Sequence, residues 1–106
     1  MTPDRLDAVF FALADGTRRT VVRRLLTRDT VTATQLAKDL PITRQAVAKH
    51  LAALTDAGLV QRHREGRETR YELTPDPLGE AAEWLEAVGD EWDDRLDRLR
   101  RHIGRE

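Results

Sequence analysis

The residues best suited to recognition chemistry lie between positions 43 and 50, in a segment with helical periodicity. If the apolar positions 47, 51 and 54 face inward, a rotation of about 100° per residue points Gln45 and Lys49 outward. Glutamine can form two hydrogen bonds with adenine, and arginine can pair with guanine or with a phosphate, so Gln45 and Arg44 are candidate base-contacting residues. Lys49 is better suited to neutralise the DNA backbone. The pattern predicts a helix that enters the major groove with its N-terminal end.

Two further residues of this segment have two interpretations each. Thr43 stands at the expected start of the helix, where its hydroxyl can cap the helix or, with the exposed amides, meet a phosphate. These two roles are compatible. His50 lies at the edge of the apolar face, which fits a partly buried histidine or a DNA contact. We count both residues among the candidate DNA-binding residues.

A second group of basic side chains surrounds Gly66 in a predicted β-hairpin. Arg62, Arg64 and Arg67 are candidate contacts to phosphates or to the minor groove, and the two nearest the turn, Arg64 and Arg67, are favoured. Three glutamates interleave with the basic residues of this hairpin. Cross-strand ion pairs that only stabilise a surface hairpin are therefore the alternative.

Capping residues and periodicity predict the helices that would position these groups. A helix is expected to begin at Thr2-Pro3 and to be followed by a second one capped by Asp15. Thr32 and Gln35 form a capping-box pair before a short helix that stops ahead of Pro41. The helix that starts at Thr43 is expected to end at Gly58, which suits the left-handed position after a helix.

The remaining chain predicts a hairpin and one long helix. Strands at 59–64 and 69–73 would flank a four-residue loop, and a helix would run from Asp76 to about Ile103. The fold class expected is mainly α (α+β), a winged helix-turn-helix of five helices and a two-stranded wing. We assign residues 1–106 to a single domain, with the helix-turn-helix at 32–58 and the wing at 59–73.

Composition limits the possible functions. Between Gly16 and His50 the chain carries eight basic residues against two acidic ones, whereas residues 76–94 carry eight acidic residues and no basic one, so a formal net charge of −1 conceals a basic front half. With no cysteine, disulfides, thiolate metal sites and cysteine nucleophiles are excluded. The longest N-terminal apolar run, at 8–14, is too short for a signal peptide or a membrane span, so we expect a cytoplasmic protein.

Three segments together resemble the ArsR family of bacterial winged helix-turn-helix repressors: LADGTRR, QLAKDLPITRQAVAKHLAALTDAGLV and REGRETRYELTPDPL. The resemblance covers nearly the whole chain. It implies a dimeric repressor that binds operator DNA and releases it when an effector binds. It also implies that residues 44–57 form the recognition helix and residues 59–73 the wing.

The predicted C-terminal helix carries an apolar stripe that is sustained over about four heptads, as in a helix that seeks a partner. Packing on its own domain is the alternative. We predict dimerisation through residues 1–14 and 76–103. The candidate interface residues are Leu6, Val9, Phe10, Leu78, Leu85, Trp92, Leu96 and Leu99.

No cofactor or metal site is predicted. The resemblance implies sensor sites built from cysteines or from spaced Asp and His ligands on the last helix, but that helix offers only His102 and Glu106 here, which make a poor metal site. The expected partners are double-stranded operator DNA, a second copy of the chain and an unknown small-molecule effector. The alternative is a winged-helix module that binds protein instead of DNA. An enzyme has little support, because nucleophile, phosphate-loop and paired acid-base motifs are missing from the sequence.

Overall fold

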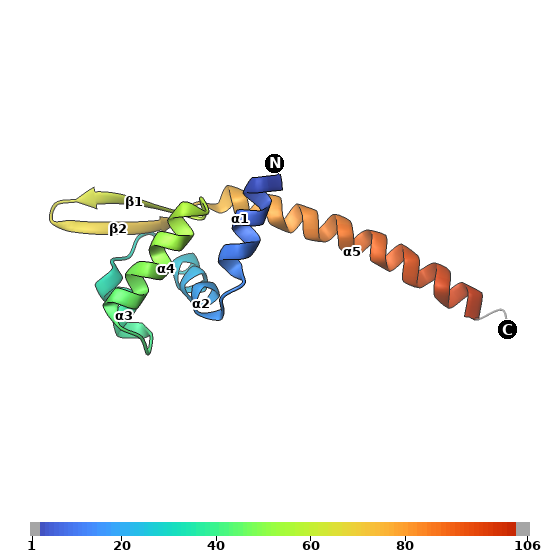
Figure 1. The fold of residues 1–106 in the computed structure, drawn as a ribbon, viewed down its shortest axis with the longest axis horizontal. Coiled ribbons are helices and arrows are strands. Elements are labelled where there is room, and N and C mark those ends of the chain that lie inside the picture. Colours follow the sequence, from blue (N-terminus) through green and yellow to red (C-terminus); the bar gives the residue numbers. More distant parts are fainter. Residues whose placement is uncertain (1–2, 104–106) are drawn as a thin grey trace.

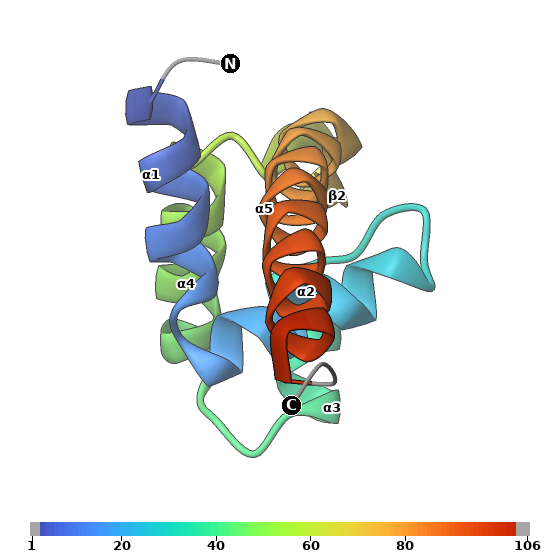
Figure 2. The same cartoon turned by 90° about the vertical axis from the view of Figure 1, so that its right-hand side faces the viewer.

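The computed structural model describes residues 3–103, which form five helices and one antiparallel hairpin (Figure 1). The predicted winged helix-turn-helix fold is confirmed. Helix α5 leaves the body on the side opposite the hairpin, and it runs beside α1 near the body (Figure 2). The elements are α1 Pro3–Leu13, α2 Gly16–Leu26, α3 Ala33–Asp39, α4 Arg44–Asp56, β1 Val60–Glu65, β2 Glu68–Leu73 and α5 Pro75–Ile103.

Helices α2, α3 and α4 each begin at a side-chain cap, as the sequence predicts. The Asp15 carboxylate accepts a hydrogen bond from the Arg18 amide at 3.0 Å at the start of α2. Thr32 and Gln35 form the full capping box before α3, with reciprocal hydrogen bonds of 3.1 and 2.9 Å. After α4, Gly58 has a φ of +79°, the left-handed conformation that glycine adopts at low cost.

The core lies between α1, α2, α4 and the start of β1. The apolar face of α4 is completely buried, which confirms the predicted inward positions and fixes which face of α4 remains outside. The fully buried large side chains include Val9, Val21, Val31, Leu36, Val47, Leu51, Leu54 and Leu59.

The hairpin is tighter than predicted. Its ladder continues to the pair Glu65↔Glu68, so that Gly66 and Arg67 form a two-residue turn instead of the expected four-residue loop. Gly66 has a φ of +63°, and glycine at the first central position is typical of the type II′ turns that close hairpins. At the other end of β2, Tyr71 exchanges two backbone hydrogen bonds with Val31, at 2.7 and 3.0 Å. The wing is thereby joined to the segment just before α3.

Only the first turns of α5 pack on the body. Pro77 and Ala81 are buried, Leu78 packs against the core, and the Trp84 ring meets Phe10 edge to face at 5.6 Å between centroids. The rest of α5 extends the molecule to 69 Å and is largely exposed (Figure 1). In the described part of the chain, no helix combines the length and apolar character needed to cross a membrane.

One of the candidate interface residues requires a correction. Val9 is completely buried within its own protomer, so its side chain is not available to a partner. Leu6 and Phe10 are partly buried and pack against the same core, whereas Phe11 is 78% exposed. The apolar stripe of α1 therefore faces mainly into the domain.

Candidate nucleic-acid interface

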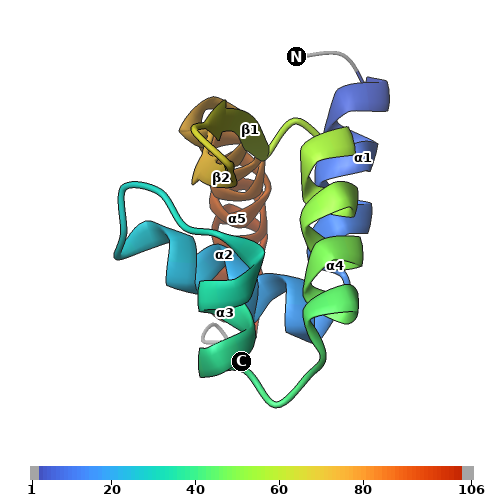
Figure 3. The same cartoon turned by 90° about the vertical axis from the view of Figure 1, so that its left-hand side faces the viewer.

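The N-terminal end of α4 lies at the end of the molecule that also carries the wing. Viewed from the wing side, α3, α4 and the hairpin face the viewer while α5 lies behind them (Figure 3). Because the opposite face of α4 is buried, Arg44, Gln45 and Lys49 are all exposed on this side. The structure thus exposes, on one helix, three of the side chains for which a DNA contact is predicted.

Thr43 combines its two predicted roles without conflict. Its side-chain oxygen accepts a hydrogen bond from the Ala46 amide at 3.1 Å, so it caps α4. A hydroxyl also carries a proton that it can donate, and Thr43 is exposed. The cap therefore leaves a donor at the positive end of the helix dipole, where a phosphate would be stabilised.

A groove of about 340 Å³ lies between the start of α3, the first turns of α4 and β2. Arg44 and Gln45 form one side of it, and Thr69 and Tyr71 of the wing form the other. Ala48, one turn after Arg44, also lines the groove, and its small side chain leaves room there. Sequence reasoning missed the groove because its walls come from segments far apart in the chain. The small residue on the outer face of α4 was the available signal.

The wing sorts its charges by face. In the observed register Arg62 pairs with Tyr71 and Arg64 with Thr69, so these two arginines share the strand face of the side chains that line the groove. The wing's three glutamates and Arg70 lie on the other face. Arg67 is exposed in the turn. Ion pairs of Arg70 with Glu65 and Glu68 lie on one face of the hairpin, and Arg62 and Arg64 lie on the other, where their contact with DNA stays a prediction.

The exposed face of α4 and the wing also carry unpaired positive charge. Among the described residues, Arg44, Lys49, Arg62, Arg64 and Arg67 make no intramolecular ion pair or side-chain hydrogen bond. Other arginines are paired, as in the Arg28–Asp39 contact at 2.9 Å. Five exposed, unpaired cations at one end of a molecule of nearly zero net charge form a surface that suits a polyanion.

Comparison with known proteins agrees with this geometry. Residues 13–63 match the model of a helix-turn-helix domain family. The transcriptional regulator YuzN of Bacillus subtilis is 41% identical over 87 residues, which cover 76% of this chain and 95% of YuzN. An ArsR-like transcriptional regulator from Rhodococcus superposes with a TM-score of 0.77 at 42% identity, covering 92% of both chains. The chain belongs to the ArsR family of winged helix-turn-helix transcriptional regulators.

A further structural relative of this ArsR-family regulator is a dimer. The homodimeric winged helix-turn-helix DNA-binding domain Mb0332 from Mycobacterium bovis has a TM-score of 0.67 at 27% identity, covering 83% of this chain and 81% of that domain. The family assignment and the geometry of α3 and α4 together make this chain a DNA-binding transcription regulator.

Several of the regulator's basic residues between positions 16 and 50 stabilise its own fold. Arg18 donates to the Ala12 carbonyl at 2.6 Å and Arg19 to the Leu13 carbonyl at 2.7 Å, so both satisfy carbonyls at the end of α1. The excess of basic residues between positions 16 and 50 therefore overstates the charge that faces DNA.

His50 differs from the unpaired cations in its burial. It is partly buried and close enough to Asp15 to interact with its charge. The hydrogen bond from the Arg18 amide lowers the pKa of the Asp15 carboxyl, and the positive charge of Arg18 acts in the same direction. This position, beside the start of α2, favours the partly buried interpretation of His50 over a DNA contact.

The regulator's described residues contain no group of three or more His, Cys, Asp or Glu side chains arranged to hold a metal ion.

On α5, Arg95 lies over the Trp92 ring at 5.9 Å, and these two residues with Leu99 and His102 line an open surface of the helix.

Proposed function

We propose that this regulator is a homodimeric repressor in which each protomer inserts the N-terminal end of α4 into the major groove of an operator. Gln45 and Arg44 contact base edges, while Thr43 and Lys49 contact phosphates. The wing contributes Arg62, Arg64 and Arg67 to phosphates or the adjacent minor groove. The observation that carries the proposal is the set of five exposed, unpaired cations on α4 and the wing, the two elements that border the groove.

The dimer in this proposal forms through α5, with α1 beside it. Leu85, Trp92 and Leu99 follow one another at heptad spacing and are 54%, 54% and 55% exposed, with Leu96 partly buried between them. Large apolar side chains in a continuous row are costly to leave in water, so this row favours a second copy as its partner. The homodimeric state of Mb0332 supports a dimer for this chain as well.

A two-fold dimer would place two α4 helices in successive major grooves about 34 Å apart. Bound near a promoter, such a dimer would exclude polymerase, which is the basis for proposing repression. The proposal assigns the chain a non-catalytic role in the cytoplasm, where the bacterial chromosome lies, and includes a small-molecule effector of unassigned chemistry.

The test is a titration of the purified protein against the DNA upstream of its own gene, at several salt concentrations. Each phosphate contact contributes a slope of about −0.9 to the logarithm of the binding constant against the logarithm of the salt concentration. We expect site-selective binding with a steep slope. Non-selective or absent DNA binding would contradict the proposal and favour the module that binds protein.

Two variants separate base reading from backbone contact. Gln45→Ala should relax the base preference at one position of each half-site in a selection from randomised sequences. Arg64→Ala with Arg67→Ala should weaken binding to all sequences alike and flatten the salt slope by about 0.9 for each lost contact. Arg101→Ala, which removes an exposed arginine on α5, is the matched control and should change neither. An unchanged sequence selection with Gln45→Ala would refute the assignment of base reading to that residue.

A further inference from the structure

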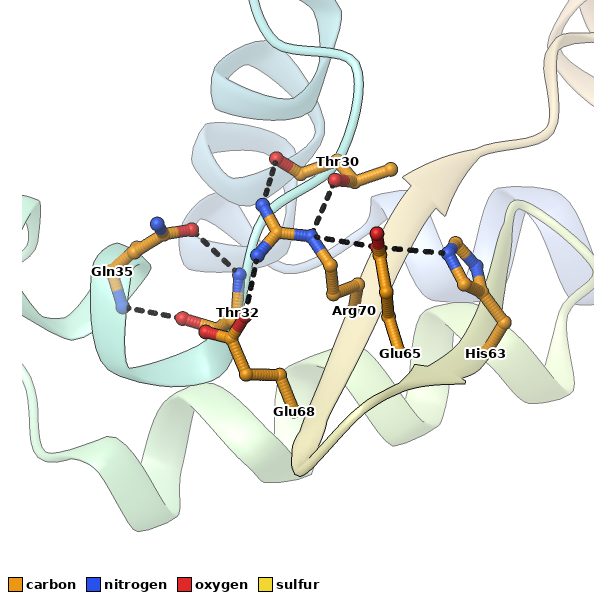
Figure 4. A network of polar contacts seen from close by, with 7 residues as sticks. All are labelled: Thr30, Thr32, Gln35, His63, Glu65, Glu68 and Arg70. Atoms are coloured by element: carbon orange, nitrogen blue, oxygen red, sulfur yellow. Dashed lines mark hydrogen bonds and ion pairs between the residues drawn. The ribbon is translucent and has the colours of Figure 1, made fainter.

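Arg70 lies on the strand face of the wing opposite to that of Arg62 and Arg64, and Figure 4 shows its polar contacts. Its guanidinium reaches from β2 to the connection between α2 and α3, where Nε donates to Thr30 Oγ1 at 2.6 Å and Nη2 to the Thr30 carbonyl at 3.3 Å. The Arg70 side chain is only 18% exposed. Arg62, Arg64 and Arg67, in contrast, are exposed and unpaired among the described residues.

Arg70 also holds the two glutamates that flank the wing turn. Nη1 lies 3.2 Å from Glu68 Oε1, and Nε lies 3.8 Å from Glu65 Oε2, which in turn lies 3.9 Å from His63 Nε2 (Figure 4). Glu65 and Glu68 are direct cross-strand partners, and like charges in that position destabilise a hairpin. The Arg70 cation therefore relieves a repulsion that would open the tip of the wing.

The contacts of Arg70 continue to the helix-turn-helix. Thr30 precedes Val31, whose backbone pairs with Tyr71 of the wing. The next residue, Thr32, forms the capping box of α3. Arg70 thus strengthens a chain of contacts that runs from the wing to the start of α3, which packs on α4.

We propose that Arg70 is a positioning residue of the DNA interface. By tying β2 to Thr30, it fixes the angle of the wing to α4 and keeps Arg64 and Arg67 where they meet the DNA backbone, without contacting DNA itself. The inference rests on the proposed function, since it assumes that the wing binds DNA.

The test is a double-mutant cycle measured by operator titration. Arg70→Gln should weaken binding about tenfold when Arg64 and Arg67 are present. In a background with Arg62, Arg64 and Arg67 all replaced by Ala, the same change should have less than about a twofold effect, because Arg70 acts only through the wing arginines that contact DNA. Effects that multiply in the combined variant would show a direct DNA contact by Arg70 and overturn the inference. The matched control is Arg100→Gln, which removes a paired arginine on α5.

A second variant removes the hydroxyl of Thr30, which Arg70 contacts. Thr30→Val deletes the hydroxyl that accepts from Arg70 and leaves the charge of the wing unchanged, so weaker operator binding by this variant would support positioning. In both Arg70→Gln and Thr30→Val, amide exchange at Val31 and Tyr71, measured without DNA, should be faster than in the wild type. Unchanged binding and exchange in both variants would refute the inference. A wild-type protein that does not bind the operator would refute the proposed function instead.

Discussion

Replacing Leu85 and Leu99 on α5 by glutamate should convert the proposed dimer into monomers. The two leucines are 54% and 55% exposed in the protomer, and burying the exposed half of one leucine side chain contributes about 1 kcal/mol. A two-fold dimer buries four such side chains, so their loss costs about 4 kcal/mol of association free energy. That corresponds to a dissociation constant about a thousandfold higher. The new carboxylates would raise the dissociation constant of the dimer further, because an unpaired charge is costly to bury.

Sedimentation velocity over a range of protein concentrations would measure this change, and far-UV circular dichroism would show that the protomer remains folded. Ala87→Glu is the matched control. Position 87 is exposed and lies about 200° around the helix from Leu85, so this variant places a carboxylate on α5 outside the stripe and should leave the dimer intact. A double variant that still sediments as a dimer at low micromolar concentration would refute the assignment of the interface to this face. Operator affinity should fall together with the dimer, since one protomer reaches only one half-site.

The remaining predictions concern the stability of α4 and of α2. Thr43→Ala should lower the free energy of unfolding by about 1 kcal/mol in urea titrations, whereas Thr43→Ser, which keeps the cap, should change it little. Leu51→Ala should destabilise by about 2–5 kcal/mol in the same titration, because Leu51 is completely buried. The pKa of Asp15 is lowered in the folded protein, so its carboxylate stabilises the fold above the ordinary carboxyl pKa, and this contribution is lost as the pH falls through the lowered value. Asp15→Asn still caps α2 and should therefore reduce the decline of the urea midpoint below about pH 4; an unchanged decline would argue against this role of Asp15.

The caps and the buried face of α4 could be predicted because they depend on short-range geometry. Thr32, Thr43 and Asp15 each bond an amide three residues ahead, and this relation holds wherever the helix lies in the fold. The hairpin turn was mispredicted for a comparable local reason. Glu65 and Glu68 are poor strand residues by type, but a type II′ turn at Gly66 leaves both in the ladder.

The packing of α1 shows a limit of periodicity. The spacing of Leu6, Val9 and Phe10 identifies an apolar face correctly, but the same spacing serves a domain core and a subunit interface equally well. The structure places Val9 in the core and leaves Phe11 exposed, outside the predicted stripe. Which surface covers an apolar stripe depends on contacts with elements distant in sequence, and no local pattern contains that information.

The charge on each face of the wing depends on strand register, so the length of the turn has a consequence for function. In sequence, basic and acidic residues alternate almost evenly, yet the observed pairing places Arg62 and Arg64 on the groove face and Glu65, Glu68 and Glu72 on the other. A slip of one residue in one strand would exchange the faces of its side chains. In β2 it would bring Glu68 and Glu72, together with Arg70, to the face that Arg62 and Arg64 now share with the groove, so the positive charge available to a phosphate there would be reduced. The length of the turn at Gly66 therefore determines how much positive charge the wing presents beside α4.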